Sequence, residues 1–143
     1  ILIIFITNIL LSILLGSMVF FTAVVSPSIF ASLTNNASSK LLRTIFPRMF
    51  LFGFIITVVC LVLTLIISDF FVSLLLIFIS LSFIINRNYI TPRINYYRDI
   101  ELEGDQKAKA LFKKMHLLSV LMFLINFILL LTIILMNYIN YHL

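Results

Sequence analysis

The sequence has few charged residues, three glycines, three prolines and a single cysteine. Asp, Glu, Lys and Arg make up only 10% of the 143 residues, against about 25% in soluble domains, whereas 63% are hydrophobic. A chain of this composition lacks the polar surface that water requires, which excludes a soluble enzyme and a disordered tail. The lone Cys60 excludes a disulfide scaffold and lies in an apolar run, where a thiol packs as a small core residue. The sequence therefore indicates an integral membrane protein.

Motifs that carry chemistry are missing as well. The sequence has no glycine-rich phosphate loop, no Cys-x-x-Cys pair, and no set of Ser, His and Asp on one predicted side of the membrane. We therefore expect a protein that is not an enzyme and that holds neither a cofactor nor a metal. Tryptophan is absent, so 15 Phe and 5 Tyr supply the aromatic residues, which in lipid are packing and interface residues first.

Four apolar runs are long enough to cross a bilayer. A helix with a rise of 1.5 Å per residue needs about 20 apolar residues to cross ~30 Å of hydrocarbon. The runs cover about residues 2–25, 49–67, 70–90 and 117–136, and Pro92 is expected to stop the third helix. The predicted fold is all-α, a four-helix membrane bundle that forms a single domain over residues 1–143. Acids and bases are missing from the centres of these runs, which argues against a proton relay.

The basic residues are confined to one predicted side of the membrane. All ten lie between the first two runs or around and after the end of the third: Lys40, Arg43, Arg48, Arg87, Arg93, Arg98, Lys107, Lys109, Lys113 and Lys114. By the positive-inside rule, the connections of about 26–48 and 91–116 are cytoplasmic and both termini lie outside, as in a bacterial inner membrane protein. This distribution favours membrane orientation over nucleic-acid binding, which needs a basic stripe on a soluble face.

The two halves of the sequence share features in the same order. Ser26-Pro27 follows the first run as Thr91-Pro92 follows the third, 65 residues later, and Phe46 precedes the second run as Phe112 precedes the fourth. This spacing favours two parallel helical-hairpin repeats related by a pseudo-twofold axis along the membrane normal. Chance similarity between apolar segments is the alternative.

Helix-start signals occur in both cytoplasmic connections. Asn36 is placed to cap a short helix over residues 37–46, and Gly104-Asp105 precedes a helix that we expect to run from Gln106 to Met136.

Small or polar residues recur along one face of the predicted spans. The members are Asn8, Ser12, Gly16, Thr57, Ser119 and Asn126. Such residues either pack helices against one another or line a polar cavity for a small ligand. Both interpretations stay open.

Two further features are candidates for binding. His116 either ligates a haem or metal or makes an interfacial hydrogen bond, and the other histidine, His142, is predicted on the opposite side of the membrane. A lysine cluster, Lys107, Lys109, Lys113 and Lys114, either contacts anionic lipid or an acidic partner, or only sets the topology.

Three short motifs carry a family resemblance. The segments 16–21 (GSMVFF), 26–30 (SPSIF) and 45–50 (IFPRMF) resemble the transmembrane protein 205-like family of small four-span proteins. The second half is similar at Asn88, Pro92, Arg98, Phe112, His116, Ser119 and Asn126. The resemblance covers nearly the whole chain and implies the four-span fold. It implies no settled chemistry, since the bacterial members are largely of unknown function.

These observations favour an interaction protein. We expect an accessory or assembly subunit that packs against another membrane protein or a second copy, within the lipid bilayer. The alternative is a small-solute or lipid transport or binding protein that acts as an oligomer.

Overall fold

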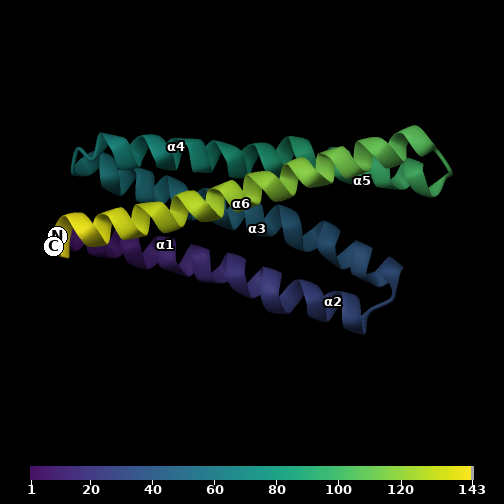
Figure 1. Cartoon of the computed structure of the whole chain (residues 1–143), viewed down its shortest axis with the longest axis horizontal. Coiled ribbons are helices and arrows are strands. Elements are labelled where there is room, and N and C mark those ends of the chain that lie inside the picture. Colours follow the sequence, from purple (N-terminus) through teal and green to yellow (C-terminus); the bar gives the residue numbers. More distant parts are fainter. Residues whose placement is uncertain (143) are drawn as a thin grey trace.

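The chain folds into four long helical rods, each of which is one helix or a run of consecutive helical segments (Figure 1). The computed structural model describes the backbone of residues 1–142 and the side chains of residues 1–140. The elements are α1 (Leu2–Phe20), the π-helical turn η1 (Phe21–Val25), α2 (Ser26–Ser32), α3 (Asn35–Ile66), α4 (Phe70–Ile85), the π-helical turn η2 (Asn86–Ile90), α5 (Thr91–Leu102) and α6 (Gln106–His142). Four helices are long and apolar enough to cross a membrane: Leu2–Ser32, Asn35–Ile66, Phe70–Leu102 and Gln106–Asn140. The expectation of an all-helical protein with four candidate spans is confirmed.

Two of the rods pass through proline instead of ending there. Pro27 is the second residue of α2 and Pro92 the second residue of α5, and each of these helices follows directly after a π-helical turn. Proline lacks an N–H and clashes with the carbonyl four residues before it. A π turn widens the backbone at that point and accommodates the ring. The expectation that Pro92 stops the third helix is therefore wrong.

The second rod is likewise continuous through Pro47, which lies inside α3. The separate short helix expected over 37–46 is the first part of this helix. Its N-cap is Thr34 and not the expected Asn36. The Oγ1 of Thr34 accepts a hydrogen bond of 3.4 Å from the amide of Ala37. The two residues differ little in capping propensity, so the sequence alone did not separate them.

The start of the last helix matches expectation. Gly104 has a φ of +103°, which favours glycine, and it turns the chain between α5 and α6. Asp105 then caps α6, because its Oδ1 accepts hydrogen bonds from the amides of Lys107 (2.7 Å) and Ala108 (3.2 Å). The helix continues past the expected Met136 to His142.

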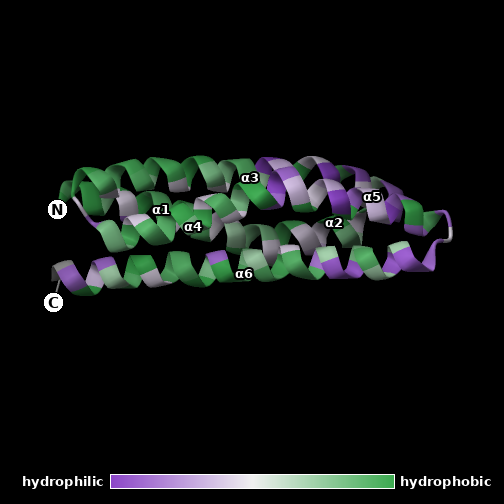
Figure 2. Ribbon diagram, turned by 90° about the horizontal axis from the view of Figure 1, so that it is seen from above, coloured by the Kyte–Doolittle hydropathy of each residue, from purple (hydrophilic) through white to green (hydrophobic). Residues whose placement is uncertain are grey.

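The rods are longer than a bilayer core. A helix of about 32 residues spans ~48 Å, against ~30 Å of hydrocarbon. Most of the surplus lies at the end that carries the α2–α3 and α5–α6 connections, where hydrophilic residues gather in Figure 2. Both termini and the α3–α4 turn lie at the opposite end (Figure 1). The expected connections of about 26–48 and 91–116 are thus mostly helical extensions of the spans.

The core sits in the half of the bundle nearest the termini. There α1 packs against α3 and α6, and α4 packs against α3 and α6, which closes a ring of four helices. Leu11, Leu14, Leu76, Leu130 and Ile133 are among the side chains fully buried inside it.

An aromatic row links this core to the basic end. The ring centroids of Phe21 and Phe46 lie 5.3 Å apart, those of Phe46 and Phe50 6.1 Å apart, and those of Phe50 and Phe83 6.5 Å apart. Gly53 lies directly against the Phe83 ring, so α3 and α4 approach closely at this point.

Candidate functional site

The small and polar residues singled out on α1 lie on its outer side or at its edge. Ser12 and Gly16 are exposed, and a Cβ added at Gly16 would meet no atom within 4 Å. The inward face of this helix is formed by Thr7, Leu11, Leu14 and Met18, at steps of four and three residues. Asn8 is half-buried, and its Oδ1 accepts a hydrogen bond of 2.8 Å from Nδ2 of Asn137 on α6. Of the three residues Asn8, Ser12 and Gly16 on α1, only Asn8 makes a side-chain hydrogen bond to another helix within the described residues.

Two other members of the set, Thr57 and Asn126, lie inside the bundle. Thr57 is fully buried, and its hydroxyl donates to the carbonyls of Gly53 and Phe54 on its own helix. Asn126 is 1% exposed, and its Oδ1 has no hydrogen-bond partner among the residues that the structure describes. Neither Thr57 nor Asn126 is accessible from the surface of the bundle.

Ser119 belongs to a reciprocal pair that joins α6 to η2. Its hydroxyl donates to Oδ1 of Asn86 at 2.7 Å, and Nδ2 of Asn86 donates to the carbonyl of Ser119 at 3.3 Å. Asn86 is 1% exposed. Sequence reasoning missed this residue, and the presence of two amides, Asn86 and Asn88, at the end of an apolar run was the available signal.

A cavity of about 570 Å³ lies at the basic end of the bundle, between η1, α2, α3, α5 and α6. Its volume falls within the range of about 300–1,000 Å³ that is typical of small-molecule pockets. The ring of four helices that encloses the core does not extend to this end of the bundle. At this end α2 contacts α3, through a hydrogen bond from Ser38 to the carbonyl of Ile29 among others, but within residues 1–142 it approaches neither α5 nor α6. The cavity exists because α2 diverges from the other helices.

The lining of the cavity changes character along the bundle axis. Its phenylalanines are Phe21, Phe30, Phe46, Phe50, Phe112 and Phe123, and its hydrophilic side chains are Thr22, Ser26, Asn35, Ser39, Arg43, Thr91, Asn95, Arg98, His116 and Ser119. Along α3, the polar Asn35 and Ser39 come first, Arg43 follows, and Phe46 and Phe50 lie deepest. Along α3 the lining therefore passes from polar and cationic to aromatic, whereas on α6 Phe112 lies beside Arg98 at the polar end.

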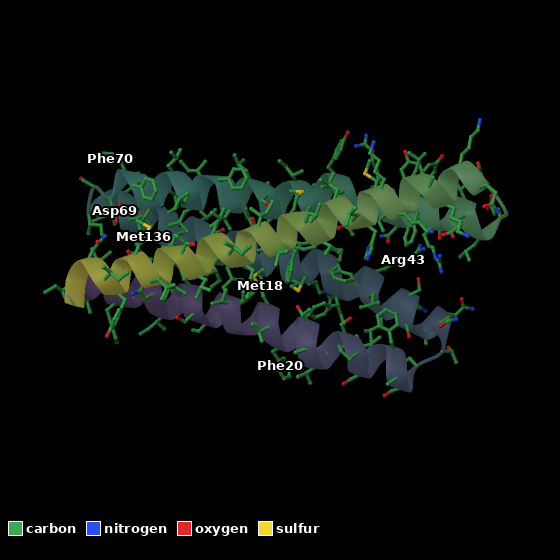
Figure 3. All side chains as sticks on the ribbon, in the orientation of Figure 1. Met18, Phe20, Arg43, Asp69, Phe70 and Met136 are labelled. Atoms are coloured by element: carbon green, nitrogen blue, oxygen red, sulfur yellow. The ribbon has the colours of Figure 1, made fainter. Side chains whose placement is uncertain are left out.

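Two arginines at the polar end pair with carboxylates that lie outside the lining. Arg43 on α3 is labelled in Figure 3, in the half of the bundle away from the termini. It donates to both carboxylate oxygens of Asp99 on α5, one of them at 3.1 Å. Arg98 donates to Glu101 at 2.8 Å, and its guanidinium lies 5.2 Å from the centroid of the Phe112 ring. The first pair ties the second span to the third at the mouth of the cavity.

His116 is on the wall of this cavity. It is exposed, and its ring stacks on Phe112 with centroids 5.9 Å apart and an angle of 13° between the planes. Within the part of the chain that the structure describes, no group of three or more His, Cys, Asp or Glu is arranged to hold a metal ion. The side chain of His142 lies outside the described residues.

The lysine cluster is on the solvent side of α6. Lys107, Lys109, Lys113 and Lys114 are all exposed, and none of them belongs to the ion pairs found within residues 1–140.

Cys60 is fully buried, with its sulfur 4.0 Å from the carbonyl of Thr7. This thiol is a packing residue, as the apolar run around it indicated.

The ion pair at the mouth is expected to stabilise the fold only weakly. A double-mutant cycle of Arg43→Gln and Asp99→Asn should give a coupling free energy of about 0.2–1 kcal/mol, because the two side chains are 34% and 55% exposed. Unfolding by sodium dodecyl sulfate in mixed micelles measures it. A coupling above about 2 kcal/mol would contradict the exposed geometry and indicate a desolvated pair.

Together, the fold and the cavity define an all-helical protein with four helices able to span a membrane. The chain belongs to the family described as a domain of unknown function (DUF4149), whose model matches residues 9–101. The matched segment runs from α1 to the last turn of α5 and carries both π-helical turns. No curated protein and no solved structure matches the chain.

Proposed function

We propose that this protein is a non-enzymatic membrane protein that binds a small amphiphilic molecule from the bilayer. The observation that carries the proposal is the cavity at the basic end, which joins an aromatic interior to a polar, cationic mouth. A lipid-like molecule has the same division into an apolar part and a polar part. Of the functions expected from the sequence, the geometry supports lipid binding or transport best.

The position of α2 supports an entrance from the side. This helix and α6 both contribute to the cavity wall, yet they do not approach each other within residues 1–142. The wall is therefore interrupted between α2 and α6, where both helices extend from the candidate spans. Such an opening would let an amphiphile enter from the adjoining lipid.

A second candidate is the accessory subunit that the sequence favoured. The outward position of Ser12 and Gly16 on α1 supports it, since small exposed residues let another helix approach closely. The partner is another membrane protein or a second copy of the chain. In that case the lysine cluster contacts anionic lipid or an acidic partner surface.

Finer assignments of topology and relationship belong to the same proposal. Each π-helical turn is followed at once by a Ser-Pro or Thr-Pro pair, and the two sites lie 65 residues apart in the sequence. This correspondence supports two parallel helical-hairpin repeats. The three motifs in segments 16–21, 26–30 and 45–50 support kinship with the transmembrane protein 205-like proteins. The distribution of basic residues supports a bacterial inner membrane location.

The proposed orientation places the basic end in the cytoplasm. In a Cys60→Ala background, we expect a membrane-impermeant maleimide to label Asn140→Cys on intact cells, because the C-terminal end lies outside. Lys109→Cys should be labelled only after the cells are opened. Both positions are exposed in the structure, so access to the side chain is equal. Labelling in the reverse order would contradict the orientation.

The binding proposal is tested by photocrosslinking in the native membrane. A photoreactive phenylalanine analogue at Phe123, in the cavity, should capture one discrete small molecule. The same analogue at Phe78, which is 55% exposed on α4, should capture the bulk lipids of the membrane. Identical products at the two positions would show that bulk lipid alone reaches the cavity and would overturn the proposal.

A further inference from the structure

We infer that the cavity selects an amphiphile with an anionic head, a carboxylate or a phosphate, and that Arg43 and Arg98 bind this head. The aromatic end, at Phe46 and Phe123, then holds the apolar chain. This inference rests on the proposed function and names the chemical class of its ligand. The ligand is committed to one source, a molecule dissolved in the bilayer.

The charges of the lining favour an anion. Among the residues that line the cavity in the described structure, the only Asp, Glu, Lys or Arg side chains are Arg43 and Arg98. Their carboxylate partners, Asp99 and Glu101, do not line it. A head with a negative charge therefore meets two guanidinium groups without meeting a carboxylate inside the cavity.

Both guanidinium groups keep donors for a ligand. Each guanidinium carries five N–H bonds in a planar fork that matches carboxylate and phosphate. The salt bridge of Arg98 uses one terminal nitrogen, and that of Arg43 uses two and faces an exposed carboxylate of Asp99. The Asn95 side chain on α5 adds a neutral hydrogen-bonding group to the same lining.

The order of groups along the helices fits an amphiphile that lies parallel to them. From Arg43 to Phe50 along α3 the rise is about 10 Å, and from Phe112 to Phe123 along α6 it is about 16 Å. The cationic end faces the part of the protein that carries all ten basic residues and four of the five acidic ones. A positive field there attracts anionic lipid heads to the mouth.

The test uses the absence of tryptophan from the sequence, which makes one introduced tryptophan the only such fluorophore. Phe123→Trp places it in the cavity, and Phe78→Trp gives a matched position facing lipid. The full-length protein is reconstituted in neutral phosphatidylcholine vesicles at about pH 9, where a carboxyl group is ionised. Three chain-labelled nitroxide quenchers are titrated: a fatty acid, its methyl ester, and a phosphatidic acid.

The two anionic probes should quench the Phe123→Trp protein at a mole fraction about tenfold lower than the methyl ester does. A hydrogen bond to a charged group is strong enough to change a dissociation constant by about this factor. The Phe78→Trp protein should respond equally to all three probes. Equal quenching by acid and ester in the cavity, at lower mole fractions than at position 78, would overturn the anionic head and leave the binding function intact. Quenching no stronger at position 123 than at position 78, for every probe, would overturn both.

Variants identify the arginines as the cause. In the Phe123→Trp protein, Arg43→Gln with Arg98→Gln should abolish the preference for acid over ester, and Arg43→Lys with Arg98→Lys should keep most of it. Lys40→Gln with Lys109→Gln removes the same charge from exposed positions outside the lining and should leave the preference unchanged. A loss of preference in this control instead would show that surface charge, not the cavity, selects the probe.

Inorganic phosphate identifies the source of the head. Millimolar phosphate should leave the quenching by the fatty acid unchanged, because the chain contributes to binding inside the cavity. Displacement of the probe by phosphate alone would overturn the commitment to a bilayer lipid. The comparison of acid with ester in the parent protein needs no arginine variant, so the proposal stays testable if those variants fail to fold.

Discussion

Replacing Gly53 by alanine is expected to lower the free energy of unfolding by about 1–3 kcal/mol, the range for overpacking a filled core. An added Cβ would lie 2.8 Å from Cε2 and Cζ of Phe83 and 2.9 Å from its Cε1. Phe83 is 1% exposed and continues the aromatic row through Phe50, so its ring has little room to shift. Sodium dodecyl sulfate unfolding in mixed micelles, followed by circular dichroism, measures the difference.

The matched control is Gly16→Ala. This glycine also lies in a membrane-spanning helix, but an added Cβ meets no atom within 4 Å. Its substitution should leave the unfolding midpoint unchanged or raise it slightly, since alanine has the higher helix propensity. Equal losses at Gly53 and Gly16 would mean that backbone flexibility, and not close packing of α3 on α4, accounts for both.

Replacing Asn86 by leucine is expected to destabilise the bundle by about 1–3 kcal/mol, because two interhelical hydrogen bonds to Ser119 are lost at a buried position. The bonds fix α6 to the π-helical turn η2 through Ser119, which lines the cavity. The same unfolding assay in mixed micelles measures the loss.

Asn88→Leu is the control for this substitution. Asn88 lies two residues further along the same turn and is exposed, and its side chain is bonded to the adjacent Arg87. Its replacement should change stability by less than about 0.5 kcal/mol, as is usual at a surface. A cycle with Ser119→Ala should then show coupling at Asn86 and none at Asn88. Independent effects of Asn86→Leu and Ser119→Ala would contradict the reciprocal pair.

The spans were predictable because lipid imposes a simple rule. Every backbone polar group in the bilayer must bond internally, so a long apolar run becomes a helix whatever its neighbours are. The start of the last helix at Gly104-Asp105 was predictable for a local reason, since a positive φ and a capping carboxylate act within a few residues.

The behaviour of the prolines was not predictable from local rules. Pro27, Pro47 and Pro92 all lie in helices, and two of them follow π-helical turns. A proline usually ends or kinks a helix because it lacks an N–H and its ring clashes with the carbonyl four residues before it. At Pro27 and Pro92 the preceding π-helical turn changes the winding of the backbone, so the helix accommodates the ring and continues.

The candidate site depends on where whole helices lie. A helical wheel groups Asn8 with Ser12 and Gly16, but which face of α1 turns inward is decided by the larger Leu11, Leu14 and Met18, which fill the core. The cavity arises because α2 diverges while α5 and α6 remain paired. No spacing within one segment encodes that divergence, so neither the cavity nor the contact from Arg43 to Asp99 was visible in the sequence.

The most direct test of the account is native mass spectrometry of the protein extracted gently from its own membrane, in wild type and two variants. Ile94→Trp places a large side chain in the cavity, and Ile85→Trp places one on the lipid-facing side of α4, where Ile85 is 45% exposed. The account predicts a small amphiphilic adduct on the wild type and on Ile85→Trp that is lost from Ile94→Trp. An adduct that persists in Ile94→Trp, or a heteromeric assembly without any adduct, would contradict it, and the second result would establish the accessory role.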